Sequence, residues 1–199
     1  MLILASASLT RKALLTQAGV AFRAETAPID ERAIEAELLA EGGRPEDVAL
    51  GLAAAKARAV GTSHRDSFVI GADQVLALDL EILHKPADRS AAEAQLDRLK
   101  GRDHLLHSAV ALAHEGDIIW SKLVSARLTM RSFSPAERDE VLNLEGEAAF
   151  TSVGGYRLEG VSIRLFEKIE GDYFAILGLP LVELLAALRH HAPQTLVPA

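Results

Sequence analysis

An acidic residue stands inside an apolar stretch of the sequence, at Asp73 in the segment VIGADQVLAL. The segment predicts a buried strand, where a carboxylate is costly unless another group pairs it. The alternation of a strand would place Asp73 on the same face as Gly71, which allows a ligand or a second backbone to come close, and would place Gln74 on the opposite face. Asp73 is therefore either a functional carboxylate or one half of a buried structural ion pair.

A second group of polar residues lies near the N-terminus, where ASASLTRKALL predicts a strand that turns into a helix. Ser6 and Ser8 offer hydroxyls at the turn, and Arg11 and Lys12 fall in the first helical turn. Cations at a helix N-terminus are unfavourable because they face the positive end of the macrodipole. A bound anion would compensate their charge and accept hydrogen bonds from the unpaired N–H groups. This corner predicts a phosphate site; the alternative is a serine cap with two solvated basic side chains.

Two lysines extend this set of groups. Lys56 lies on a helix of small apolar residues, GLAAAKARAV, where it either snorkels to solvent or points into a site. Lys85 follows Asp73 in a His-Lys-Pro turn. A carboxylate with lysines and an arginine suits metal-assisted phosphoryl chemistry, because the acid holds Mg²⁺ or accepts a proton from water while the cations neutralise phosphate.

Asp30 and Glu31 begin a predicted helix, where acidic residues are expected as caps. On local grounds the pair is structural. His104 and His107 are three residues apart on a predicted strand, so they point to opposite faces and make a poor metal pair.

The elements that would carry these residues alternate along the chain. Helices are expected over 10–18, 30–43, 44–61, 90–100, 134–144 and 180–191, and strands over 2–5, 20–25, 68–78, 104–113 and 118–130, with residues 192–199 as a tail. Pro45 in a first helical turn and Ser134 with Glu137 are the helix-start signals. Residues 160–180 are expected to contain one more strand and a structural turn at Asp172 and Tyr173. The alternation predicts an α/β or α+β fold, with a twisted mixed sheet and flanking helices. No repeat or long linker divides the chain, so a single domain over 1–199 is expected, with two lobes as an option.

The composition argues against several classes of protein. The 199 residues are 49% hydrophobic and 25% charged, with a formal net charge of -7. This acidic balance argues against a general binder of nucleic acid or of anionic membranes. There are no cysteines, which excludes disulfides and cysteine-based zinc sites. The apolar run at the N-terminus is too short for a membrane span, so we expect a cytoplasmic enzyme.

With these residues in view, the sequence resembles the Maf nucleoside triphosphate pyrophosphatases. The resemblance covers nearly the whole chain, and its motifs keep their order and spacing. The matching segments are LILASASLTRKALL, Asp30-Glu31, Lys56-Ala57, GADQV, EILHKP and GGYRLEGVSIRLFEKIEGDYFAILGLPLVELLAAL.

The resemblance implies a mixed α/β fold of the Maf/ITPase type, with two lobes around a cleft. It implies hydrolysis of a nucleoside triphosphate to the monophosphate and pyrophosphate, with a divalent ion, Mg²⁺ or Mn²⁺. Asp73 resembles the catalytic acid, and Glu31 resembles a second acid that helps to hold the metal. The set that would face the phosphates comprises Ser8, Arg11, Lys12, Lys56 and Lys85. A homodimer is one option for the assembly.

Three positions bear on the base. Thr10 stands where the family has an arginine, and this position is also thought to help set the base preference. Gln74 and Glu159 replace the Thr and Gln of the branch that acts on dTTP and UTP, and resemble the branch that prefers 7-methyl-GTP. A glutamate could accept hydrogen bonds from a guanine edge and would suit a cationic methylated purine.

The sequence is also compatible with two other functions. One is a nucleotide-binding regulator of septum formation with little turnover, which the missing arginine would favour. The acids Asp73 and Glu31 speak against it, since a pure binder does not need them. The other is a pyrophosphatase directed at dTTP and UTP, or at inosine and xanthosine triphosphates.

Overall fold

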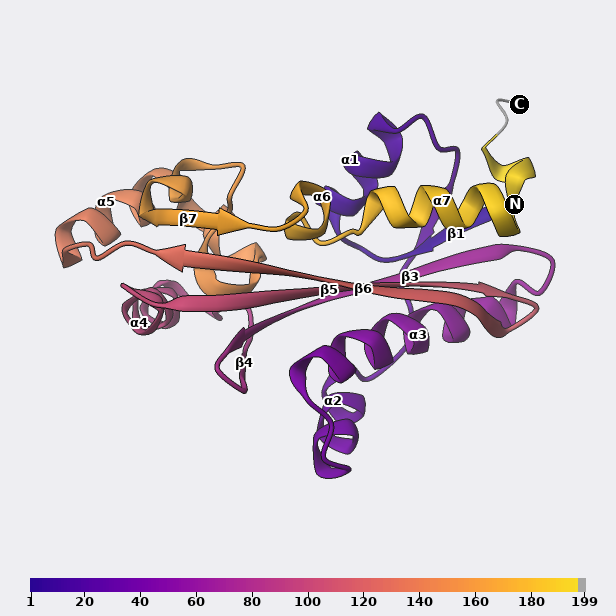
Figure 1. Cartoon of the computed structure of the whole chain (residues 1–199), viewed down its shortest axis with the longest axis horizontal. Coiled ribbons are helices and arrows are strands. Elements are labelled where there is room, and N and C mark those ends of the chain that lie inside the picture. Colours follow the sequence, from indigo (N-terminus) through magenta and orange to yellow (C-terminus); the bar gives the residue numbers. More distant parts are fainter. Residues whose placement is uncertain (197–199) are drawn as a thin grey trace. The chain divides into compact units, whose positions relative to one another are not determined.

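A computed structural model describes residues 1–196, which contain a seven-stranded mixed sheet with flanking helices (Figure 1). The strand order is β2-β1-β3-β5-β6-β7, with β4 paired to β3. β1 runs parallel to β2 and β3, whereas β4 is antiparallel to β3 and β7 is antiparallel to β6. The strands are β1 (Leu2–Ala5), β2 (Arg23–Glu25), β3 (Phe68–Leu78), β4 (Glu81–Leu83), β5 (Asp103–His114), β6 (Asp117–Met130) and β7 (Phe166–Glu170). The prediction of a mixed α/β fold is confirmed.

The chain divides into two compact units. The first contains residues 1–74, 107–124 and the described chain from Asp172 onward, and the second contains residues 75–106 and 125–171. The long strands β3, β5 and β6 contribute residues to both units.

In the first unit, helices cover both faces of the strands (Figure 1). The helices α1 (Leu9–Gln17) and α7 (Leu181–His191) pack on the face that carries the even-numbered residues of β1 and β3. The helix α3 (Pro45–Ser63) lies on the other face, with α2 (Glu31–Ala40) packed against it. Apolar residues of the first face form one core cluster, which includes Leu4, Leu15, Ile70, Leu112 and Leu184.

Gly71 sets the distance between β3 and α3. A Cβ added at Gly71 would overlap the carbonyl oxygen of Ala53 and lie 2.6 Å from the amide nitrogen of Ala57. The two backbones therefore touch, and only glycine fits between them. Because Gly71 and Asp73 share one strand face, the same approach turns Asp73 toward α3. Of the two expectations for Gly71, the structure shows the close approach of a second backbone.

Several element limits differ from the prediction. Gly61 was expected to end α3, but the helix continues to Ser63, because Gly61 is buried inside it and a Cβ there would meet Gly116 at an ordinary 3.6 Å. β2 begins at Arg23 rather than Val20, and the short strand β4 was not predicted. The segment expected to be a turn after Asp172 contains the helix α6 (Tyr173–Ile176).

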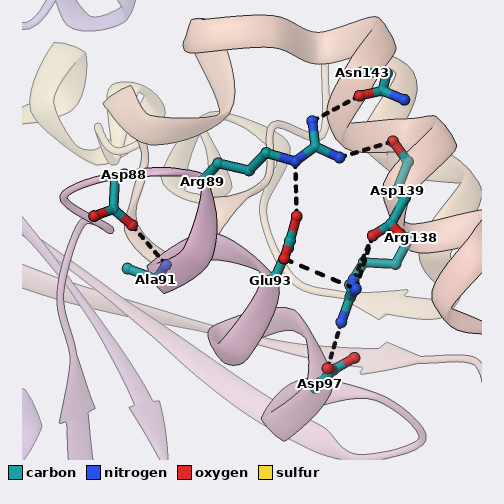
Figure 2. Close-up of polar contacts among 8 residues, drawn as sticks. All are labelled: Asp88, Arg89, Ala91, Glu93, Asp97, Arg138, Asp139 and Asn143. Atoms are coloured by element: carbon teal, nitrogen blue, oxygen red, sulfur yellow. Dashed lines mark hydrogen bonds and ion pairs between the residues drawn. The ribbon is translucent and has the colours of Figure 1, made fainter.

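The second unit contains α4 (Arg89–Leu99) and α5 (Pro135–Glu145), which a polar network joins (Figure 2). Arg89 donates to Glu93 at 2.7 Å and to Asn143 at 2.6 Å, so it links the two helices. Arg138 of α5 bonds to Asp139 at 2.8 Å and reaches back to Asp97 of α4. α5 starts with the predicted serine and Glu137, which form a capping box.

A histidine–tyrosine pair anchors the irregular part of this unit, which includes 3-10 turns over Gly146–Thr151, Val153–Gly155 and Val161–Leu165. His104 Nε2 lies 2.7 Å from the hydroxyl of Tyr156, and both residues are buried. The Tyr156 ring packs edge-on against Phe166, with centroids 4.9 Å apart. His104 Nδ1 has no hydrogen-bond partner among the described residues. Burial lowers the pKa of His104 to about 4, so the ring is neutral near pH 7.

α7 is followed by a single 3-10 turn over Pro193–Thr195, and the last three residues of the expected tail lie outside the described residues. Across the described chain, no helix combines the length and apolar character that a membrane crossing requires.

Candidate active site

The N-terminal corner is built by the short connection between β1 and α1. Ser8 is the N-cap of α1, and its hydroxyl accepts a hydrogen bond from the backbone N–H of Arg11 at 3.3 Å. Ser6 Oγ in turn accepts from the Ser8 N–H at 3.2 Å. Among the described residues, no partner accepts a hydrogen bond from the N–H groups of Leu9 and Thr10. The serine cap that the sequence offered as the alternative is present at Ser8, and the helix end still keeps N–H groups that could donate hydrogen bonds to an anion.

Arg11 is held firmly rather than solvated. Its Nε donates to the carbonyl of Gly178 at 2.7 Å, and its Nη1 donates to the carbonyl of Ala72 at 2.9 Å and to Ser6 Oγ at 3.3 Å. Its Nη2 has no partner among the residues that the structure describes. The alternative of a solvated arginine is wrong for this residue, because the guanidinium is oriented by three acceptors and keeps one nitrogen for a ligand.

Lys56 brings two carboxylates together. Its Nζ lies 2.5 Å from Asp73 Oδ1 and 2.9 Å from Glu31 Oε1. Lys56 and Asp73 are both buried, at 8% and 7% exposure, whereas Glu31 is exposed. Glu31 is the first residue of α2 and Asp30 is its cap, accepting from Ala33 N–H at 3.0 Å. The local expectation of a cap is therefore confirmed for Asp30, while Glu31 turns toward Lys56.

The electrostatics tie Arg11 to the same cluster. Burial lowers the pKa of the Arg11 guanidinium below its ordinary value, and the negative charges of Asp73 and then Glu31 oppose that shift. Arginine remains protonated under such conditions. Two acids and two cations thus lie within electrostatic reach of one another, as a neutral set before any ligand binds.

The donor set fits a magnesium-like ion that is shared with a phosphate. Within residues 1–196, no group of three or more His, Asp or Glu residues gathers as a metal site. Asp73 and Glu31 each contact Lys56 through one oxygen, which leaves Asp73 Oδ2 and Glu31 Oε2 as oxygen donors. Mg²⁺ is commonly held by one or two carboxylates together with substrate phosphates rather than by an all-protein cage. The residues present therefore fit such an ion.

The segment 172–178 also belongs to this site, although the sequence indicated only a structural role. Gln74 Nε2 donates to the carbonyl of Ile176 at 2.9 Å and to Ser108 Oγ at 2.9 Å. Ser108 Oγ donates to the carbonyl of Ala175 at 2.6 Å. Ser108 and Gly178 were missed, and the available signal for Ser108 was the same as for Asp73, a polar residue in an apolar run.

Comparison with known proteins identifies the family to which the chain belongs. A family model described as Maf-like protein matches residues 1–191. The chain belongs to the Maf family. The resemblance of its motifs is thereby confirmed over nearly the whole sequence.

Relatives within the Maf family are full-length matches. The "7-methyl-GTP pyrophosphatase" of Rhizobium meliloti is 50% identical over 189 residues, 95% of each chain. The "Nucleoside triphosphate pyrophosphatase" of Bradyrhizobium diazoefficiens is 54% identical over 188 residues, 94% of this chain and 92% of the relative. The "7-methyl-GTP pyrophosphatase" of Brucella abortus is 49% identical over 188 residues, 94% of each.

The remaining Maf motif residues lie in two places. Thr10 and Lys12 are half-buried on the first turn of α1, beside Arg11. Lys85 is exposed between β4 and α4 in the second unit. Glu159 also lies in the second unit, where its Oε1 accepts from Arg157 Nε and Nη2, both at 3.1 Å. The first unit therefore gathers Arg11, Lys56, Asp73 and Glu31, and the roles of Lys85 and Glu159 stay predictions.

Proposed function

We propose that this Maf protein hydrolyses a nucleoside triphosphate to the monophosphate and pyrophosphate, with attack of water at the α-phosphorus. The observation that carries the proposal is the convergence of Asp73 and Glu31 on Lys56, with Arg11 in the same electrostatic set. A purely structural ion pair needs one acid for one lysine. The second acid and the anchored arginine suit a polyanionic substrate with a metal ion.

The phosphates would bind to the N-terminal corner of the first unit. Arg11 Nη2 and the N–H groups of Leu9 and Thr10 are donors without partners among the described residues. A phosphate there would accept hydrogen bonds from these donors and would be attracted to the positive end of the α1 dipole. Ser8, Lys12 and Lys85 complete the phosphate-facing set that the Maf motifs imply.

The acids would hold the metal and activate water. Enzymes of this family are generally metal-dependent. In our proposal Asp73 and Glu31 hold Mg²⁺ or Mn²⁺, which when bound neutralises phosphate charge and polarises the phosphoryl oxygens. Where Glu31 and the phosphates hold the ion, the second oxygen of Asp73, which makes no contact with Lys56, would instead accept a proton from the attacking water. Lys56 compensates the charge of both acids and orients them.

We infer 7-methyl-GTP as the favoured substrate. Several relatives at about half identity carry that name, while the relative at 54% identity is named for nucleoside triphosphates in general. Glu159 would accept hydrogen bonds from the guanine edge, and Thr10 would adjust the fit beside Arg11. We also propose a homodimer, which analytical ultracentrifugation would test.

The test is product analysis with the purified protein, Mg²⁺ or Mn²⁺, and a panel of dTTP, UTP, CTP, GTP, 7-methyl-GTP, ITP and XTP. We expect pyrophosphate and the monophosphate, with 7-methyl-GTP preferred. Release of orthophosphate and a diphosphate would overturn the reaction. Binding without release from any nucleotide would favour the regulator, and reversion of Thr10→Arg would then be tested for recovered turnover.

A further inference from the structure

The side-chain amide of Gln74 has no hydrogen left to donate. Its Nε2 lies 2.9 Å from Ser108 Oγ, 2.9 Å from the Ile176 carbonyl and 3.1 Å from the Ala175 carbonyl. A primary amide nitrogen carries two hydrogens, and three acceptors already surround it. A base edge that needed an N–H donor from Gln74 would have to displace one of them.

The orientation of this amide is fixed by its surroundings. Exchanging the amide oxygen and nitrogen would point an oxygen at the carbonyls of Ala175 and Ile176, which is repulsive. Ser108 donates its own hydrogen to the Ala175 carbonyl at 2.6 Å, so its oxygen accepts from Gln74. Ser108 is fully buried, at 0% exposure, which makes an unpaired group there costly.

The segment that Gln74 and Ser108 hold also carries the acceptor for Arg11. Gly178 follows α6 with φ +96°, and its N–H bonds to the Ala175 carbonyl at 2.8 Å. Its carbonyl then accepts Arg11 Nε at 2.7 Å. A Cβ at Gly178 would lie 3.6 Å from the guanidinium nitrogens and 3.7 Å from Gln74 Oε1, so the turn packs against both side chains.

Arg11 also bonds to β3, the strand that carries Gln74. Its Nη1 donates to the carbonyl of Ala72 at 2.9 Å, two residues before Gln74 on β3. The guanidinium is thus held between the strand and the turn, and the turn is held to the strand by Gln74 and Ser108. A shift of the turn would move the Gly178 carbonyl and, with it, the direction of Arg11.

We propose that Gln74 and Ser108 are positioning residues that fix the turn 175–178 and thereby orient Arg11 toward the phosphates; this rests on the proposed function. Gln74 then acts on the phosphate end of every nucleotide rather than on the base. The role that the resemblance gives Gln74, a part in base selection, predicts the opposite pattern: loss of Gln74 would change the ranking of nucleotides.

The experiment compares Ser108→Ala and Gln74→Met with wild type and with Ser162→Ala. Ser162 is a matched control, since it is also 0% exposed and its hydroxyl has no partner among the described residues. Two quantities are measured: the Kd for inorganic pyrophosphate with Mg²⁺ by calorimetry, and kcat and KM for 7-methyl-GTP and UTP. Pyrophosphate has no base, so it reports the phosphate end alone.

We expect both positioning variants to weaken pyrophosphate binding and raise both KM values about 3- to 10-fold, the loss typical of one hydrogen bond. The ratio of kcat/KM between the two nucleotides should stay within about twofold, and Ser162→Ala should match wild type. Ser108→Thr, which keeps the hydroxyl, should bind pyrophosphate more tightly than Ser108→Ala does. Thermal unfolding checks each fold; if Ser108→Ala does not fold, Gln74→Met decides.

Two results would overturn the proposal. One is an unchanged pyrophosphate Kd together with a ratio between the nucleotides that shifts by more than about fivefold, which would make Gln74 a base reader. The other is a loss in Ser162→Ala equal to that in Ser108→Ala. If wild type releases no pyrophosphate from any nucleotide, the proposed function fails, while the pyrophosphate Kd values still decide the positioning role.

Discussion

At the scale of single residues, Asp73 is the group on which the proposed chemistry depends most. Asp73→Asn keeps the size and one acceptor toward Lys56 but removes the charge that would bind a metal or take a proton. We expect turnover to fall about 10²–10⁴-fold, the usual contribution of general acid–base catalysis. The fold should persist, because Glu31 still pairs Lys56 at 2.9 Å. Initial rates and circular dichroism check this, and a folded, fully active Asp73→Asn would remove Asp73 from the mechanism.

Glu31 and Asp30 form a matched pair of neighbouring acids. Glu31 reaches Lys56, whereas Asp30 caps α2. Glu31→Gln should raise the metal concentration needed for half-maximal turnover about tenfold or more, and a tenfold change is about 1.4 kcal/mol. Asp30→Asn should leave that concentration unchanged, because asparagine caps helices as well as aspartate does. Metal titrations of both variants make the comparison; equal shifts would mean that Glu31 acts only through the start of α2.

His104 gives a prediction on stability and pH. Its pKa falls from an ordinary 6.5 to about 4 in the folded chain, through burial, with the negative charge of Asp103 opposing. Below pH 6.5 the unfolded chain binds this proton and the folded chain does not, so stability decreases as the pH falls from 6.5 toward 4. From pH 7 to 5 the loss is about 2 kcal/mol from this residue, at about 1.36 kcal/mol per pH unit.

Urea unfolding of wild type and His104→Asn at both pH values measures this term. The variant should lose less stability on acidification, because asparagine does not titrate. Burial also lowers the pKa of His107, so part of the dependence on pH should remain in the variant. An identical loss of stability in both proteins would show that His104 takes up its proton in the folded state.

At the scale of elements, the contact between β3 and α3 decides whether Lys56 reaches Asp73. Gly71→Ala would place a methyl group against the α3 backbone at Ala53 and Ala57. We expect a loss of about 1–3 kcal/mol in the free energy of unfolding, as for other overpacked sites, and a lower kcat as the helix moves away.

Gly61→Ala is the control on the same helix. A Cβ there would meet Gly116 Cα at 3.6 Å, an ordinary contact, inside a regular helix. This variant should be neutral or more stable by about 0.5–1 kcal/mol, because alanine favours helix. Chemical denaturation of the two variants makes the test, and a Gly71→Ala protein as stable as wild type would contradict the close packing of β3 on α3.

The strand faces could be predicted from the sequence because a strand has a strict two-residue period. That period put Asp73 beside Gly71 and put Gln74 on the opposite face, and the structure shows both. The helix starts at Ser8, Pro45 and Ser134 were likewise local signals.

The contacts of Gln74 could not be predicted. Its partners Ala175 and Ile176 are 101 and 102 residues away and accept through backbone carbonyls, which leave no mark in the side-chain pattern. The prediction that α3 ends at Gly61 was wrong for a related reason, since a glycine packed inside a helix and a glycine that ends a helix look alike in the sequence.

At the scale of the whole molecule, an acidic protein must bind a polyanion. The formal net charge is -7. Because the charges of Arg11 and Lys56 are balanced by Asp73 and Glu31, the attraction would come from Arg11 Nη2 and from the N–H groups at the start of α1, which have no partner among the described residues. The metal adds the remaining positive charge in the proposed complex.

The most direct test of the proposed reaction is to run it in ¹⁸O-labelled water with Mg²⁺ and locate the label by mass spectrometry. Attack at the α-phosphorus predicts one ¹⁸O in the nucleoside monophosphate and none in the pyrophosphate, with Asp73→Asn forming neither product at a comparable rate. Label in the pyrophosphate, or products formed equally fast by Asp73→Asn, would contradict the reaction proposed for this site.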